Sequence, residues 1–272
     1  MEEHKSVEEL EEIVESLNNS TKLLIQRDLE LSRANEKLRD LDKMKSEFVS
    51  LATHQLRTPL SGVRWSLSML LNGDMGPLAP EQKIYLMKTY GSNNRMITLI
   101  NDMLQADRVE SGTLKFKFTP TNLTYLFQNI LIELRQIAEK RNISVTFTTD
   151  GDIPPLMIDP ENMRIVIQNL VDNAIKYSKP KGEVNVIVKK TESTINIEIK
   201  DHGIGIPQAN QSSIFKRFFR APNAVHEETD GTGLGLYIVE SIIQRHQGTI
   251  RFESKENEGT TFFVTLPITK NA

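Results

Sequence analysis

The stretch Phe48-Val-Ser-Leu-Ala-Thr-His-Gln-Leu-Arg-Thr-Pro-Leu60 decides how the chain is organised. From it onward, apolar residues recur at alternating spacings of four and three, namely Leu56, Leu60, Val63, Leu67 and Leu70. This spacing predicts a helix that buries one stripe against a partner helix. His54 lies about 160° from the centre of the stripe, so we expect its imidazole to face solvent as a reachable nucleophile.

Pro59 lies inside this helical pattern and has no N–H to donate to the carbonyl of Gln55, so we expect a bend beside His54. By itself, an exposed histidine on a helix is far more often a solvated side chain than a nucleophile. The residues Thr53-His-Gln-Leu-Arg-Thr-Pro-Leu60 resemble the H-box of sensor histidine kinases. In that family the histidine takes the γ-phosphate of ATP and passes it to an aspartate of a response regulator.

The composition is that of an ordinary globular protein. The chain has 272 residues, 38% of them hydrophobic and 25% charged, which favours two modest domains over one. A net charge of −3 gives no electrostatic reason to expect nucleic acid or an anionic membrane as the main partner. The absence of cysteine excludes disulfides, zinc-thiolate sites and thiol catalysis.

Apolar runs in the sequence are short. None approaches the roughly 18 residues that a membrane span needs, and the N-terminus lacks the apolar core of a signal peptide. We therefore expect a cytoplasmic chain with no membrane segment. Many histidine kinases do span a membrane, so the chain either is a soluble member or lacks its sensor region.

The first 44 residues contain a seven-residue leucine repeat at Leu10, Leu17, Leu24, Leu31 and Leu38. Such a repeat predicts a coiled coil. The second seam is polar in either register, because it contains Ser20 and Arg27 in one and Thr21 and Asp28 in the other. A weak seam suits a signalling helix that switches between packings, and it is equally compatible with a plain dimerising spacer.

A second helix follows the first after the turn-forming segment 72–80, which is rich in glycine and proline. It repeats the same rhythm as far as Glu110, through Leu86, Tyr90, Ile97, Ile100 and Leu104, and Gly112 lies just beyond as a stop. The two helices form an antiparallel hairpin with one apolar face. Pairing with a second copy buries that face best, so we expect a homodimeric four-helix bundle.

The remainder predicts a second fold. Leu114–Thr119 alternates like a strand that Pro120 ends, and we place the domain boundary near Gly112. Helices are expected at 123–140, from Pro160 with Asp159 as N-cap, and at 233–247. Strands are expected at 143–148, 156–158, 183–190, 194–201, 249–254 and 260–266. This pattern predicts an α/β sandwich with helices on one face of a mixed sheet, and an α+β multidomain chain as a whole.

The helix from Pro160 has two contrasting faces. Met163, Ile167, Leu170 and Ala174 form its buried stripe, and Asn169, Asn173 and Lys176 lie opposite. Asparagines are poor helix formers on a solvated face, so we propose a specific use for them. An amide oxygen suits Mg²⁺, and a lysine suits the phosphates that Mg²⁺ bridges. A simply solvated face is the alternative.

Two glycine-rich segments complete the pattern. Asp201-His-Gly-Ile-Gly-Ile-Pro207 follows a strand, and Gly231-Thr-Gly-Leu-Gly-Leu236 opens a helix, where glycines let backbone N–H groups approach phosphate oxygens. Neither segment is a Rossmann fingerprint or a P-loop.

In order and spacing, segments 169–178, 201–206, 215–220 and 231–236 resemble the N, G1, F and G2 boxes of the histidine kinase ATP-binding domain, a sandwich of the Bergerat type. With the H-box, the resemblance covers residues 44 to 268. It implies a coiled-coil signalling helix (1–44), a dimerisation and histidine phosphotransfer domain (45–112) and a catalytic ATP-binding domain (113–272). It also implies ATP and Mg²⁺ as cofactors and a response regulator as partner.

The resemblance further implies roles for individual residues. Asn173 would ligate Mg²⁺ with support from Asn169, and Lys176 and Tyr177 would line the nucleotide. Asp201 would accept a hydrogen bond from the adenine amino group. The adenine end would be shaped by Gly203 and Gly205, and the phosphate end by Gly231, Gly233 and Gly235. Arg220 would reach the γ-phosphate, and the lid would comprise residues 208–232.

Gln55 departs from the family, which usually has Glu or Asp directly after the histidine. An amide is not a useful base at pH 7, so we expect a slower kinase rather than an inactive one, since phosphoryl transfer depends chiefly on positioning. The rival hypothesis is a regulator phosphatase or scaffold in which Thr58 orients the attacking water. A third, a gyrase-like or mismatch-repair ATPase, is disfavoured by the H-box.

Overall fold

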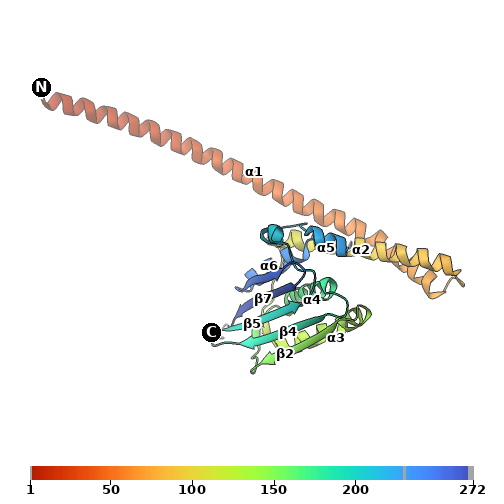
Figure 1. Ribbon diagram of the computed structural model, residues 1–272. Helices are drawn as coiled ribbons and strands as arrows, with labels where there is room; N and C mark the ends of the chain where they lie inside the picture. The colour runs from red at the N-terminus through yellow and green to blue at the C-terminus, as the bar shows by residue number, and fades with distance from the viewer. Residues whose placement is uncertain (1, 229–230, 269–272) are drawn as a thin grey trace. The chain divides into compact units, whose positions relative to one another are not determined.

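A computed structural model describes residues 2–228 and 231–268 (Figure 1). In the first helix, α1 (Glu2–Asn72), it describes the side chains of residues 17–37, 39–41 and 44–72. The chain divides into two compact units, Met1–Ala52 and Thr53–Ala272, and each is considered by itself. In the part of the chain that the structure describes, no helix is both long and apolar enough to cross a membrane.

The first unit is helical. Its leucine repeat is solvent-exposed in the single chain, with Leu17, Leu24 and Leu31 each exposed by more than half. The side chains of Leu10 and Leu38 lie outside the described residues. The coiled coil therefore stays a prediction, and the exposed repeat is a surface that a second chain would cover.

In the second unit, the end of α1 forms a hairpin with α2 (Pro80–Glu110), as predicted. The carbonyl of Leu60 accepts a hydrogen bond from Asn93 Nδ2 at 3.0 Å, and Arg57 donates to Asn101 Oδ1 at 2.7 Å. Helix α1 continues through Pro59, and the bend there stays a prediction.

Only part of the apolar stripe on α1 is covered within one chain. Leu67 is buried, whereas Leu56 and Val63 are 52% and 45% exposed. The hairpin thus leaves apolar surface uncovered on the side that the dimer prediction assigns to a second copy.

A five-stranded mixed sheet in the order β2-β4-β5-β7-β6 forms the other half of this unit (Figure 1). The strands are β2 (Ser144–Asp150), β4 (Glu183–Lys190), β5 (Thr194–Asp201), β6 (Thr249–Lys255) and β7 (Gly259–Pro267). Only β2 and β4 are parallel. Alternate residues such as Val184, Val186 and Val188 are fully buried, so one face of the sheet carries the core.

Helices cover that face: α3 (Leu123–Lys140), α4 (Pro160–Tyr177) and α6 (Gly235–Arg245). Asp159 caps α4 as predicted, because its Oδ1 accepts from the N–H of Asn162 at 2.9 Å. Two short elements precede α6, the 3₁₀ helix η1 (Gln208–Ser213) and α5 (Pro222–Glu227).

The strand predicted at Leu114–Thr119 is wrong. The strand there is β1 (Thr119–Thr121), which contains Pro120 and pairs antiparallel with β3 (Leu156–Ile158). Before it, the N–H of Lys117 donates to Asp159 Oδ2 at 2.6 Å. Leu114 and Phe116 are partly buried against the sandwich, which accounts for the alternation. The backbone of this segment bonds to the side chains of Asp159 and Asn162 and to the carbonyl of Arg108 rather than to a neighbouring strand. Helix α6 is also shorter than predicted.

Candidate functional site

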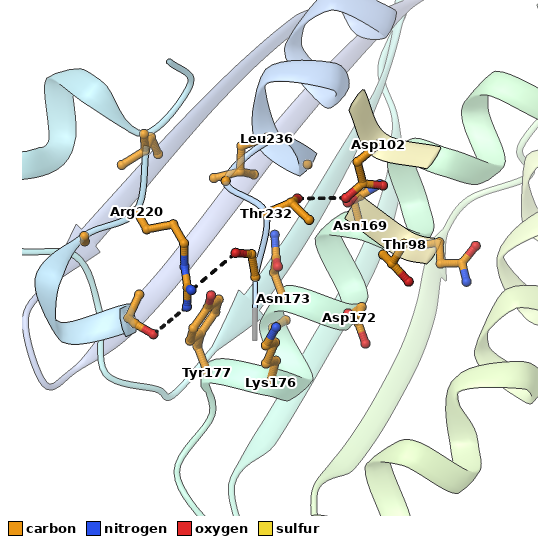
Figure 2. A pocket seen from close by; sticks show the side chains of 18 of the residues that line it. Thr98, Asp102, Asn169, Asp172, Asn173, Lys176, Tyr177, Arg220, Thr232 and Leu236 are labelled. Atoms are coloured by element: carbon orange, nitrogen blue, oxygen red, sulfur yellow. Dashed lines mark hydrogen bonds between the residues drawn. The ribbon is translucent and has the colours of Figure 1, made fainter. Parts of the chain in front are cut away.

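A cavity of about 1090 Å³ lies where α4, the glycine-rich segments and α2 meet (Figure 2). Four residues of α4 that the sequence analysis predicted line this cavity, namely Asn169, Asn173, Lys176 and Tyr177. Asn169 Nδ2 donates to the carbonyl of Ile165 at 2.9 Å, which orients the amide. Its Oδ1 then lies against Gly235, where a Cβ would meet it at 2.5 Å. The amide oxygen of Asn169 is thus directed at the start of α6.

Asp201 lines the cavity from the end of β5. Its Oδ1 accepts hydrogen bonds from the N–H of Gly203 at 2.9 Å and of Thr260 at 3.1 Å. Burial raises the pKa of Asp201 to about 6, against the lowering effect of these two hydrogen bonds. A fixed, buried carboxylate of this kind suits the recognition of a hydrogen-bond donor on a ligand.

The glycines are required by close packing. A Cβ on Gly203 would lie 2.1 Å from the carbonyl oxygen of Tyr177, and one on Gly233, at φ +68°, would lie 2.6 Å from the backbone of Phe218. Four of the five predicted glycines line the cavity: Gly205, Gly231, Gly233 and Gly235. Gly203 does not line it and instead allows the Asp201 loop to pack on the end of α4.

Arg220 lines the cavity from within the segment predicted as the lid, residues 208–232, of which 229 and 230 lie outside the described residues. Its guanidinium donates to the carbonyl of Ala224 at 3.0 Å and to that of Gly231 at 3.3 Å (Figure 2). It also donates to the carbonyl of Glu228. Three carbonyls of the predicted lid therefore hold the cation beside the glycine-rich segment 231–236, which we call the glycine loop.

Asp172 is a cavity residue that the sequence analysis missed. It lies on the same face of α4 as Asn169 and Lys176, three residues after one and four before the other, so helical spacing could have identified it. Burial raises the pKa of Asp172 and lowers that of Lys176, and each group partly offsets the other's shift by its charge. The lid residue Glu228 adds charge here and pairs with Arg141 at 2.5 Å.

Helix α2 also lines the cavity, through Arg95, Thr98 and Asp102. Thr232 Oγ1 of the glycine loop donates to Asp102 Oδ2 at 2.7 Å (Figure 2). No local pattern could have identified these residues, because the contact joins segments 130 residues apart.

His54 is solvent-exposed on α1, as predicted, together with Gln55 and Thr58. Thr58 Oγ1 lies 3.4 Å from the carbonyl oxygen of His54, one turn earlier. None of the three lines the cavity. The exposed histidine and the cavity are therefore separate sites in this structure.

The chain joins a helical hairpin that carries an exposed histidine to an α/β sandwich with helices on one face of its sheet. Asparagine, glycine and arginine residues line the cavity of the sandwich. This combination is typical of the class of two-domain histidine kinases. Two family profiles match the sequence. Residues 44–112 match the His Kinase A (phospho-acceptor) domain, and residues 158–270 match the histidine kinase-, DNA gyrase B-, and HSP90-like ATPase. The chain belongs to the sensor histidine kinase family of two-component systems.

Individual relatives agree with this assignment. The chain is 32% identical to the signal transduction histidine-protein kinase BarA of Escherichia coli (strain K12), over 89% of this chain and 27% of BarA. It is 30% identical to the catalytic domain of histidine kinase ThkA, over 57% of this chain and 99% of that domain, with a TM-score of 0.50. The chain thus spans only about a quarter of the length of BarA.

Two larger structures share the fold. Full-length ShkA in complex with AMPPNP superposes with a TM-score of 0.68 at 23% identity, covering 83% of this chain and 47% of that one. ThkA in complex with the response regulator protein TrrA superposes with a TM-score of 0.58 at 24% identity, covering 82% and 61%.

Proposed function

We propose that this chain transfers the γ-phosphoryl group of ATP to His54 and then to an aspartate of a response regulator. The observation that carries the proposal is that one chain holds both an exposed H-box histidine and a cavity lined by the N-, G1-, F- and G2-box residues. In the first step a bond forms between the imidazole Nε2 and phosphorus, the bond from phosphorus to the bridging oxygen breaks, and ADP leaves.

Within the cavity, Asp201 would accept a hydrogen bond from the adenine amino group, and Lys176 and Tyr177 would line the nucleotide. The start of α6, with Gly231, Gly233 and Gly235, presents backbone N–H groups and the positive end of a helix to phosphate oxygens. Arg220 would move from the lid carbonyls that now hold it to the γ-phosphate, where a cation stabilises the charge of the transition state.

Mg²⁺ is the metal that this cavity suits. The described residues contain no cluster of three or more His, Cys, Asp or Glu side chains that could bind a metal by themselves. The amide oxygen of Asn173, together with phosphate oxygens of the nucleotide, would supply the hard donors that Mg²⁺ prefers, and Asn169 would support this arrangement from the same helix. When bound, the ion would neutralise charge that develops on the phosphates.

The phosphotransfer part would act as a homodimer. Leu56 and Val63 remain exposed on the hairpin, and a second copy would bury them in a four-helix bundle. The domain limits 1–44, 45–112 and 113–272 belong to this proposal. So does the response regulator as partner, which the ThkA–TrrA complex supports by analogy.

Gln55 motivates the alternative of a phosphatase or scaffold with weak kinase activity. The comparisons do not favour it, since the relatives are named as histidine kinases. Gln55 is instead expected to tune the rate of a working kinase.

The test is incubation of the purified chain with γ-labelled ATP and Mg²⁺. We expect an acid-labile, alkali-stable phosphoryl group that is lost in His54→Gln and kept in His226→Gln. His226 is a suitable control because it is exposed and does not line the cavity. Wild-type labelling of His54→Gln would refute His54 as the acceptor.

A further inference from the structure

Helix α2 closes one side of the cavity, which links the phosphotransfer hairpin to the nucleotide site. The α2 residues Thr98 and Asp102 face the phosphate end, where the glycine loop, residues 231–236, opens α6 (Figure 2). This loop is the part of the proposed function that would receive the triphosphate. A hairpin residue therefore lies where nucleotide oxygens would be expected.

The contact is a specific one. Thr232 Oγ1 donates to Asp102 Oδ2 at 2.7 Å, and Thr232 Oγ1 also accepts from the N–H of Leu234 at 3.3 Å. A carboxylate oxygen on α2 thus sits at the loop that the G2 resemblance assigns to phosphate. About two turns further along α2, Glu110 pairs with Arg217. Two polar contacts hold the loop side of the sandwich against the hairpin.

Charge makes one of these contacts sensitive to nucleotide. Asp102 is partly buried, and burial raises its pKa despite the hydrogen bond from Thr232. Its anionic form and an approaching phosphate repel each other more strongly in a partly desolvated cavity than in water. The two anions therefore compete for the same loop.

We propose that Asp102 is a latch that holds the glycine loop against α2 in the nucleotide-free protein, and that the phosphates of the nucleotide displace it. The latch rests on the proposed function. It gives a reason why His54 does not line the cavity here, because the sandwich must leave α2 before a bound phosphoryl group can reach the histidine. Asp102 is a positioning residue in this scheme.

The test compares Asp102→Asn with Glu81→Gln in the full chain. The asparagine keeps the shape and an acceptor oxygen for Thr232 and removes the charge. Glu81 is exposed in the first turn of α2 and does not line the cavity, so its substitution makes the same charge change elsewhere on the same helix. Calorimetry would give the affinities for AMPPNP and ADP, and amide hydrogen exchange would follow residues 98–106 with and without AMPPNP.

We expect Asp102→Asn to bind AMPPNP about 3- to 10-fold more tightly, with a smaller gain for ADP, since like-charge repulsion grows with the phosphate charge. AMPPNP should weaken the protection of residues 98–106 in the wild type, and it should do so less in the asparagine variant, whose neutral amide keeps the hydrogen bond from Thr232 and does not repel the phosphates. Glu81→Gln should match the wild type.

The latch would be overturned if Asp102→Asn bound both nucleotides with wild-type affinity. It would also be overturned if AMPPNP did not change hydrogen exchange at residues 98–106 of the wild type. Either result would leave the kinase proposal intact. If none of the three proteins binds AMPPNP, the proposed function fails and the latch fails with it.

Discussion

This chain has Gln55 directly after the histidine, where its family usually has Glu or Asp. Gln55 is exposed next to His54 on α1. Its amide can accept a hydrogen bond from the imidazole, but a carboxylate accepts a stronger one because it is charged. The residue therefore tests how much the neighbour of the histidine contributes to the chemistry.

We predict that Gln55→Glu accelerates autophosphorylation. General-base contributions of about 10² to 10⁴ bound the gain, and we expect the low end of this range because positioning dominates phosphoryl transfer. Thr58→Ala, one turn away, should leave autophosphorylation nearly unchanged and slow dephosphorylation of the regulator. Initial rates at saturating ATP would decide the matter. An unchanged or lower rate in the glutamate variant would mean that the amide already suffices.

Asp201, to which we assign the adenine contact, carries a cost in stability. Its folded pKa of about 6 lies above the usual value, so the fold favours the protonated form. The associated stability is fully present below about pH 4 and is lost as the pH rises through 6. A shift of this size corresponds to roughly 3 kcal/mol.

We predict that Asp201→Asn is more stable than the wild type above pH 7 by up to about 2 to 3 kcal/mol, because asparagine keeps the acceptor for Gly203 and Thr260 without the buried charge. Near pH 4 the two proteins should unfold alike. Nucleotide affinity should fall at least about 10-fold, since the amide cannot replace the carboxylate at the adenine. Chemical denaturation at pH 4.5 and 8 with matched binding assays would measure both effects, and equal stability at pH 8 would contradict the buried-charge argument.

At the scale of elements, His246 joins three segments of the sandwich. Its Nε2 accepts from the N–H of Asp159 at 3.0 Å, and its Nδ1 donates to the carbonyl of Ile242 at 2.8 Å. The rings of Phe116 and Phe118 pack edge-on against it. The C-terminal end of α6, the cap of α4 and the segment after α2 are thus connected through one buried imidazole.

We predict that His246→Ala destabilises the second unit by about 2 to 4 kcal/mol, because it leaves a cavity and the N–H of Asp159 without its acceptor. His226→Ala, at an exposed position on α5, should change stability by less than about 0.5 kcal/mol. Urea unfolding of the two variants gives the comparison. Equal stabilities would show that the imidazole is not a structural link.

The same imidazole predicts a pH effect. Burial lowers the pKa of His246, against the raising effects of the Ile242 carbonyl and Asp159. Stability from the neutral imidazole is therefore present above its unfolded pKa, about 6.5, and is lost as the pH falls through the lower folded value. The wild type should lose more stability between pH 7 and 5 than a His246→Gln variant.

At the scale of the molecule, the two proposed activities lie on different surfaces. The dimer would use the stripe of Leu56 and Val63, and nucleotide binding would use the cavity around Asn173 and Asp201. Substitutions in one surface should leave the other function in place.

We predict that Val63→Glu yields monomers that still bind AMPPNP, because a charge replaces a side chain that the bundle would bury. Asn173→Asp should remain dimeric and lose nucleotide use. Trp65→Glu is the matched control, since Trp65 is exposed on the face of α1 that carries His54. Analytical ultracentrifugation and calorimetry measure the two properties. A dimeric Val63→Glu protein would show that the stripe is not the dimer interface.

The sequence by itself determined the elements of this protein. Hydrophobic spacing predicted α2, α3 and α4, the strands from β2 onward and the exposure of His54, because these depend on residues within a few turns of one another. The order of the boxes also identified the residues of α4 and the glycine loop that line the cavity. Capping of α4 by Asp159 followed from local chemistry in the same way.

Only the tertiary structure decided which segments meet. The alternation of Leu114–Thr119 suggested a strand, and whether a neighbouring strand exists to pair with it is a property of the whole fold. The same holds for Asp102, whose contact with Thr232 joins residues 130 positions apart, and for His246. Local patterns record which face of a segment is buried, but they carry no information on what lies against that face, since long-range contacts form only when the complete chain packs.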